Sequence, residues 1–216
     1  MNYFGHVSLA CRFRHSPGFL LGSMLPDFAN IARCRVPSCS DVQVSDGIAF
    51  HYVTDGVFHS LPEFRELVLE ATQRLKAAGV RKGPARASAH VGTELLLDAL
   101  LATSQLHQQA FLDALAIASP GRLGGTLRWK TVGDAHKFES LRQRLLEGSR
   151  ASDNHAVERL IARLSYSLAD RPRLCLLDLE RPALARWLHA TAFTLSDGCA
   201  PLWSSLVRVM SSHWSD

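Results

Sequence analysis

Hydrophobic residues recur along this chain at the three- and four-residue spacing of helices, and the alternation typical of strands is nearly absent. Groups of Gly, Pro and Ser interrupt the apolar segments and set the expected helix ends. The pattern predicts short helical segments over about 3–13 and 18–32, and further helices over about 41–59, 61–78, 86–118, 134–147, 153–169, 181–194 and 200–213. We therefore predict an all-α fold, a single-domain bundle of about seven or eight helices.

Three predicted helix ends depend on particular residues. Ser60 followed by Glu63 has the form of a capping box, which predicts that Ser60 caps the next helix. Gly79 suits the end of that helix, because glycine readily adopts the left-handed conformation there. Pro26 predicts a helix end or break, with Asp27 just beyond it.

The composition is that of a folded chain. With 216 residues, 47% of them hydrophobic and 20% charged, there is enough apolar material for a sizeable core. Bulk disorder would need low hydrophobicity and high net charge. No apolar window of membrane-spanning length occurs, and no cationic leader precedes an apolar stretch. The five cysteines match no zinc or redox spacing, so we expect reduced cysteines in a cytoplasmic protein.

The net charge of +4 is mildly basic, and the arginines are dispersed rather than grouped. Two interpretations remain open: a solvated surface rich in arginine, or steering of an acidic partner or phosphorylated substrate. No nucleic-acid-binding motif is present, and we expect no nucleic-acid partner.

Two triplets of metal-ligand residue types share one spacing. Positions i, i+4 and i+8 of a helix lie on one face, so each triplet lines one face. Ligands four residues apart are about 6 Å apart along the axis and can bind one ion, whereas ligands eight apart, about 12 Å, cannot. The third residue of each triplet would then bind a second ion, bind a phosphate, or contact the residues that ligate the first ion. The triplets are His51, Asp55 and His59, and His90, Glu94 and Asp98.

These triplets favour a metal site within a helical bundle and metal-assisted hydrolysis. The alternative is a set of exposed polar residues or a hydrogen-bonded buried histidine. Phe50 and Phe58 indicate that the helix carrying the first triplet is well packed, which favours the metal site. Asp98 lies among apolar residues, and because an unpaired buried carboxylate is costly, it needs a cation or an arginine as partner.

Several segments of the chain resemble the acyl carrier protein phosphodiesterases, also called holo-acyl-carrier-protein hydrolases. The opening Met1–His6 is similar to the MNFLAH start of that family, and Arg171–Leu174 is similar to its R-P-R-L turn. The other matching residues are Gly22–Leu25 with Asp27-Phe28, Gly47-Ile48 with His51 and Asp55, Leu61-Pro62-Glu63, and Glu94 with Asp98.

The resemblance implies an HD-like helical fold and a place among the HD-type metal-dependent phosphohydrolases. Such enzymes use a divalent ion, typically manganese, to release 4′-phosphopantetheine from a serine of holo-acyl carrier protein. The acidity of acyl carrier proteins would match the positive charge of this chain. The residues carried over to the site are His6, Asp27, His51, Asp55 and Asp98.

The chain also departs from the family pattern. Ala99 stands where the family has a histidine after its second carboxylate, Ser8 replaces a histidine of the opening motif, and no adjacent His-Asp pair occurs. His59 stands where the family has another aspartate, and His90 has no counterpart. We interpret this as a rearranged ligand set in which His59 and His90 replace lost imidazoles.

The sequence thus predicts a metal-dependent phosphodiesterase of lipid metabolism, with a metal-site half at about 1–118 and C-terminal helices at about 133–216. We expect manganese, with iron, magnesium or zinc as alternatives, and an acidic acyl carrier protein as substrate. The alternatives are a hydrolase of another phosphodiester, either phospholipid or nucleotide, and a non-catalytic relative that keeps the fold. The predicted metal ligands are His6, Asp27, His51, Asp55, Glu94 and Asp98, and the predicted catalytic residues are Asp55, His59 and His90.

Overall fold

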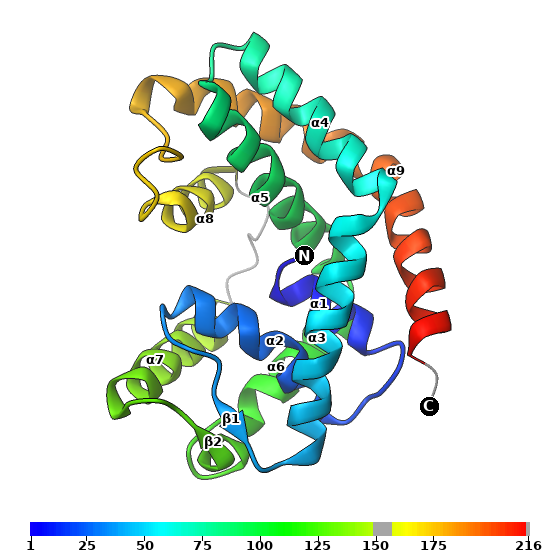
Figure 1. Ribbon diagram of the computed structural model, residues 1–216, viewed down its shortest axis with the longest axis vertical. Coiled ribbons are helices and arrows are strands. Elements are labelled where there is room, and N and C mark those ends of the chain that lie inside the picture. Colours follow the sequence, from blue (N-terminus) through cyan, green and yellow to red (C-terminus); the bar gives the residue numbers. More distant parts are fainter. Residues whose placement is uncertain (149–156, 215–216) are drawn as a thin grey trace. The chain divides into compact units, whose positions relative to one another are not determined.

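The computed structural model describes residues 1–148 and 157–214, with side chains except those of 193–198, and the regular secondary structure of these residues is almost entirely helical (Figure 1). The all-α prediction is confirmed. The α-helices of the described residues are α1 (Tyr3–Ala10), α2 (Pro17–Ile31), α3 (Val42–Ser60), α4 (Pro62–Ala77), α5 (Lys82–Leu101), α6 (Gln105–Ile117), α7 (Val132–Gly148), α8 (Val157–Leu168) and α9 (Arg181–His213).

Short elements complete the described part of the chain. Two 3₁₀ helices, η1 and η2, cover Leu123–Thr126 and Asp178–Glu180. Strands β1 (Ser38–Cys39) and β2 (Leu127–Arg128) form an antiparallel pair in which Ser38 faces Arg128. No helix among the described residues is both long and apolar enough to cross a bilayer.

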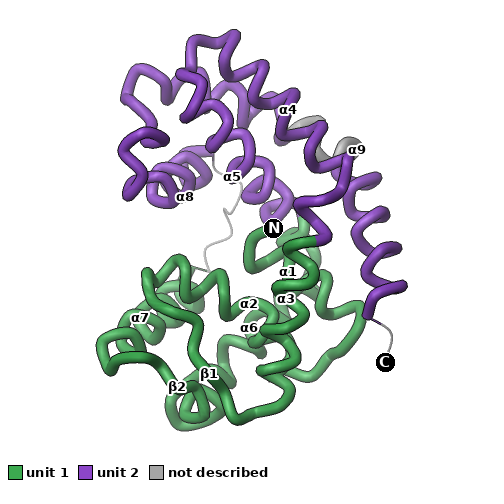
Figure 2. The backbone as a smooth tube through the Cα atoms, viewed as in Figure 1, with its two compact units in different colours: residues 1–56, 101–152 green, residues 57–100, 153–216 purple. Residues whose placement is uncertain are grey.

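The chain divides into two compact units, each built from two separate segments of sequence (Figure 2). Unit 1 comprises Met1–Gly56 and Leu101–Ser152, and unit 2 comprises Val57–Leu100 and Asp153–Asp216. Each unit is described below by itself. That the chain works as a single hydrolase domain stays a prediction.

The core of unit 1 is formed by α1, α2 and α6, which pack against one another. Helix α1 is buried from Phe4 to Ala10, as expected of a helix that is apolar on all sides. Phe19, Phe28 and Phe50 are fully buried in this unit. A histidine of α1 is therefore carried into the interior, away from solvent.

Helices α2 and α3 approach closely at two glycines of unit 1. A Cβ added at Gly22 would lie 2.2 Å from the carbonyl oxygen of Val44, and one added at Gly47 would lie 2.2 Å from that of Phe19. Both distances are far below any van der Waals contact, so the two backbones can meet only because both residues lack a side chain. This contact fixes the position of α3 against α2.

Unit 2 contains α4, α5, α8 and α9, of which α9 packs against both α4 and α8. Helix α8 buries Val157, Leu160, Leu164 and Leu168, spaced three and four residues apart as on one helix face. A Cβ added at Gly92 of α5 would lie 2.6 Å from the ring of Trp187, so the absence of a side chain there admits the indole. These contacts hold α5 against α9.

The structure corrects several predicted helix boundaries. The predicted helix 86–118 is two helices, because the Ser104 side chain accepts a hydrogen bond from the backbone of His107 and caps α6. The predicted helices 181–194 and 200–213 are a single helix, α9, which continues through Pro201. Part of the predicted helix 153–169 lies outside the described residues.

Two local predictions were also wrong, and one is confirmed. Pro26 lies inside α2, whose surrounding side chains are buried, so tertiary packing outweighs the missing backbone donor. Ser60 does not cap α4, because its hydroxyl donates to Val57 and Leu61 is the residue that precedes Pro62. Gly79 follows α4 with a φ of 91°, in the left-handed region as predicted.

Candidate metal centre

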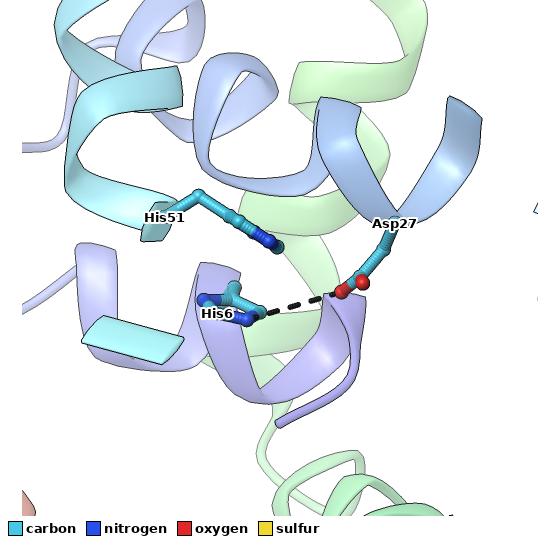
Figure 3. Close-up of side chains that lie close together, drawn as sticks. All are labelled: His6, Asp27 and His51. Atoms are coloured by element: carbon cyan, nitrogen blue, oxygen red, sulfur yellow. Dashed lines mark ion pairs between the residues drawn. The ribbon is translucent and has the colours of Figure 1, made fainter. Parts of the chain in front are cut away.

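Three of the predicted metal ligands, His6, Asp27 and His51, come together in unit 1 (Figure 3). They lie on α1, α2 and α3 respectively, and one potential ligand atom from each lies within 4.8 Å of the others. The imidazole rings of His6 and His51 stack with centroids 3.8 Å apart. We call these three residues, together with Asp55, the His6 cluster.

The glycine contact between α2 and α3 orients His51. Nδ1 of His51 lies 2.9 Å from the carbonyl oxygen of Ser23, the residue after Gly22. Because a carbonyl oxygen only accepts, Nδ1 must carry the hydrogen and donate it. We therefore assign the lone pair of His51 to Nε2.

A similar argument assigns the lone pair of His6. The Thr54 hydroxyl donates to the carbonyl oxygen of His51 at 2.9 Å, so it accepts from Nδ1 of His6 at 3.0 Å. Nε2 of His6 is buried and makes no hydrogen bond among the described residues. It lies 3.9 Å from Oδ2 of Asp27 and 3.7 Å from Oδ1 of Asp55, both too long for hydrogen bonds.

Both imidazoles are neutral at neutral pH. Burial, together with a smaller effect of the adjacent His51, lowers the pKa of His6 from 6.5 to about 3. Burial likewise lowers the pKa of His51, against the opposing effects of its hydrogen bond to Ser23 and of the Asp55 charge. Two uncharged Nε2 acceptors thus lie beside the carboxylates, where a cation is the natural partner.

The carboxylates give the His6 cluster an exposed side. The side chain of Asp55 is 37% exposed and that of Asp27 is 20% exposed, whereas that of His6 is fully buried. Oδ1 of Asp55 also accepts from the amino group of Met1 at 3.0 Å. The two carboxylates, rather than His6, are therefore the part of the cluster that meets solvent.

The donor atoms of the His6 cluster fit a divalent transition metal. Imidazole nitrogens suit zinc and iron, and carboxylate oxygens suit manganese and magnesium, so a mixed set favours manganese, iron or zinc. Ligand atoms about 2.0–2.2 Å from one ion lie roughly 3.0–3.6 Å apart. The distances from Nε2 of His6 to Oδ1 of Asp55 and to Oδ2 of Asp27, 3.7 and 3.9 Å, are only slightly longer. Each imidazole also donates its other N–H to an oxygen, the usual arrangement for metal-binding histidines.

A second group of three residues, His59, His90 and Glu94, meets in unit 2, and we call it the His59 cluster. Oε1 of Glu94 lies 2.9 Å from Nε2 of His59 and 3.2 Å from Nε2 of His90. The two imidazoles stack with centroids 4.9 Å apart, and the Phe64 ring meets both at a steep angle. Burial raises the pKa of Glu94, but hydrogen bonds from both histidines help to lower it below its ordinary value.

The contacts of the His59 cluster allow two interpretations. The three residues are within reach of one ion, and they also form a hydrogen-bonded set around a charged carboxylate. At 2.9 Å the contact of His59 with Glu94 is a good hydrogen bond, so this cluster is satisfied without a metal. The metal role of Glu94 and the catalytic roles of His59 and His90 stay predictions.

Asp98 is separate from the His59 cluster, although it lies one helical turn beyond Glu94 on α5. Its side chain is 3% exposed, and Oδ2 lies 3.8 Å from the guanidinium group of Arg163 on α8. The structure thus gives this buried carboxylate an arginine partner, one of the two kinds of partner expected from the sequence. Its role as a metal ligand stays a prediction.

Sequence reasoning missed Thr54 and Ser23, which fix the tautomers of the two histidines. Thr54 is adjacent to Asp55 in the sequence but belongs to no motif. Ser23 acts through its backbone carbonyl, which any residue type supplies. Only the packing of α1 and α2 against α3 reveals these roles.

Comparisons with protein-family models, with curated proteins and with solved structures found no match to this chain. The argument for a metal centre therefore depends on the geometry and burial of the His6 cluster.

Proposed function

We propose that this chain is a metal-dependent phosphodiesterase and that the His6 cluster is its metal centre. One observation carries the proposal: His6 and His51, both neutral and both held by a hydrogen bond from Nδ1, present unprotonated Nε2 atoms beside carboxylates. Most buried polar atoms of side chains in folded proteins have a hydrogen-bond partner. Nε2 of His6 has no hydrogen bond among the described residues.

The four residues of the cluster would have distinct roles. His6, Asp27 and His51 would hold a divalent ion, with Thr54 and Ser23 keeping the imidazoles in place. The bound ion would polarise the phosphoryl oxygen and lower the pKa of the attacking water. Asp55, the most exposed of the four, would orient that water and accept its proton.

We propose holo-acyl carrier protein as the substrate, with release of its 4′-phosphopantetheine. Two features support this choice. The segments of the chain that resemble the phosphodiesterase family include all four residues of the cluster. The net charge of +4 also suits an acidic protein partner, since opposite charges speed encounter.

The test is hydrolysis of purified holo-acyl carrier protein in the presence of manganese, followed by mass spectrometry of the carrier protein. The proposal expects loss of the phosphopantetheine mass with wild type and with His15→Ala, an exposed histidine of unit 1. It expects no conversion with Asp27→Asn. If the protein hydrolyses small phosphodiesters but not holo-acyl carrier protein, the proposed substrate is wrong. If it hydrolyses neither, the proposed phosphodiesterase function is wrong.

A further inference from the structure

A cavity of about 530 Å³ in unit 2 is lined by both cationic and apolar side chains. One wall is a single face of α5, where Lys82, Arg86 and His90 follow at four-residue intervals. The other wall is formed by the end of α8 and the residues that follow it, including Arg171 and Leu174. The volume lies within the range of small-molecule sites, about 300–1,000 Å³.

The charges that line this cavity are all positive. Lys82, Arg86 and Arg171 line it, and no carboxylate of the described residues does. Among the described residues, none of these three side chains has an ion-pair partner, although nearby arginines such as Arg81 and Arg163 do. Unpaired cations gathered round one cavity favour an anionic ligand, and guanidinium groups suit the oxygens of a phosphate.

The rest of the lining is apolar and comes from both walls of the cavity. Ala87 and Val91 lie on α5, Leu168 ends α8, and Leu174 follows it. Displacing water from these side chains with an apolar group is favourable in free energy. A ligand that matches both kinds of lining residue therefore has an anionic group and an aliphatic arm.

The cavity wall is held in place independently of any ligand. Arg81, just before α5, donates from its side chain to both carboxylate oxygens of Glu180 at 2.9 Å and to the carbonyl oxygen of Cys175 at 2.8 Å. Gly83 allows close approach, because a Cβ there would lie 3.0 Å from the carbonyl oxygen of Arg173. The segment carrying Arg171 and Leu174 is thus tied to the start of α5, which favours binding without a large ordering cost.

We propose that this cavity binds a small organic phosphate with an aliphatic arm. Arg86 and Arg171 contact the phosphate, Lys82 adds positive charge, and Val91 and Leu168 contact the arm. The proposal is independent of the metal centre, because every residue of the cavity belongs to unit 2 and none belongs to the His6 cluster. It also gives a role to Arg171 and Leu174, which the metal centre leaves without one.

The test is calorimetric titration of the full-length protein with octyl phosphate, with and without a chelator. We expect saturable binding that the chelator does not change, and much weaker binding of inorganic phosphate and of octanol. Arg86→Gln and Arg171→Gln should each weaken binding about tenfold, the effect of losing one charge-assisted hydrogen bond. Arg186→Gln, an exposed arginine of α9 outside the cavity, should bind like wild type.

A second variant tests the apolar side without changing charge. Ala87→Trp places an indole in the cavity and should abolish binding of octyl phosphate, while circular dichroism checks that the helical content is kept. Equal affinity of wild type, Arg86→Gln and Ala87→Trp would overturn the proposal. Binding that disappears with the chelator would overturn it too, because the phosphate would then be bound through a metal ion.

Discussion

Gly22 of α2 and Gly47 of α3 lie so close that a Cβ on Gly22 would be 2.8 Å from the Cα of Gly47. One residue after Gly22, the carbonyl oxygen of Ser23 accepts from His51, which is one helical turn after Gly47. The close contact of two backbones therefore sets the orientation of a candidate metal ligand. This relation gives a physical reason for glycine at both positions.

The first prediction concerns this contact. Gly47→Ala should destabilise the protein by about 1–3 kcal/mol, as overpacking does, and should also weaken metal binding because α3 must move from Ser23. Denaturant unfolding and metal titration measure the two effects. Gly56→Ala, on the same helix with nothing within 4 Å of its added Cβ, should instead stabilise by about 0.5–1 kcal/mol. Equal stability of the two variants would contradict the role given to Gly47.

The second prediction concerns Thr54, the hydrogen-bond acceptor for His6. Thr54→Val keeps the shape of the side chain but leaves Nδ1 of His6 without an acceptor, so metal affinity should fall about 10–100-fold. Thr54→Ser should restore affinity, because the hydroxyl returns. Titration with manganese measures both variants. Undiminished affinity in Thr54→Val would mean that the assigned tautomer of His6 is wrong.

The third prediction concerns Asp55. Asp55→Ala should lower turnover by about 100-fold or more while the helical content stays near that of wild type, because the side chain is partly exposed. Circular dichroism and the carrier-protein assay measure the two properties. His107→Ala, on α6 and outside the cluster, serves as a control that should keep activity. An equal loss in that control would place the active face elsewhere.

The fourth prediction concerns the acid stability contributed by Glu180. Hydrogen bonds from Arg81 lower the pKa of Glu180 from 4.5 to about 2, against the opposing effect of burial. The folded-state pKa lies below the unfolded value, so the ionised carboxylate stabilises the protein fully above pH 4.5 and loses this effect as the pH falls toward 2. Glu180→Gln should unfold at a lower temperature than wild type at pH 7.

The pH dependence of that difference is the decisive measurement. The gap in melting temperature between wild type and Glu180→Gln should be constant above about pH 5 and should narrow steadily below it. Glu139→Gln, which removes an ion pair with Arg142 in unit 1, provides a comparison away from Arg81. A gap between wild type and Glu180→Gln that does not change with pH would contradict the assigned role of the charge.

Much of the fold could be predicted from hydrophobic spacing, and the errors arose where local propensity was used to place helix ends. The helical class follows from a pattern that extends over most of the chain. Pro26 nevertheless lies within α2, where local propensity predicted a helix end, and α9 continues through the break that was expected between residues 194 and 200. In α2 the flanking side chains are buried, and tertiary packing compensates for the lost hydrogen bond.

The candidate site was only partly predictable, because spacing reports one helix at a time. The pair His51 and Asp55 follows from four-residue spacing. His6 and Asp27 are isolated in the sequence, and only the resemblance to a family suggested them. The packing of three helices brings them to His51, and no local pattern encodes that packing.

In the second triplet, equal spacing grouped residues that the structure places in different environments. His90 and Glu94 meet His59, whereas Asp98 pairs with Arg163. The exposed fraction along α5 falls from 44% at His90 to 3% at Asp98, so the stripe passes from surface to core. Four-residue spacing drifts round a helix axis, and that drift separates the environments.

The most direct test of the account is the metal content of the purified protein after dialysis against manganese, measured by elemental analysis. Wild type and His15→Ala should hold about one equivalent or more of manganese, iron or zinc per chain. Asp27→Asn/His51→Ala should lose one equivalent relative to both while keeping its helical circular dichroism. Wild type without bound metal, or a double variant that keeps the full content, would contradict the His6 cluster as a metal centre.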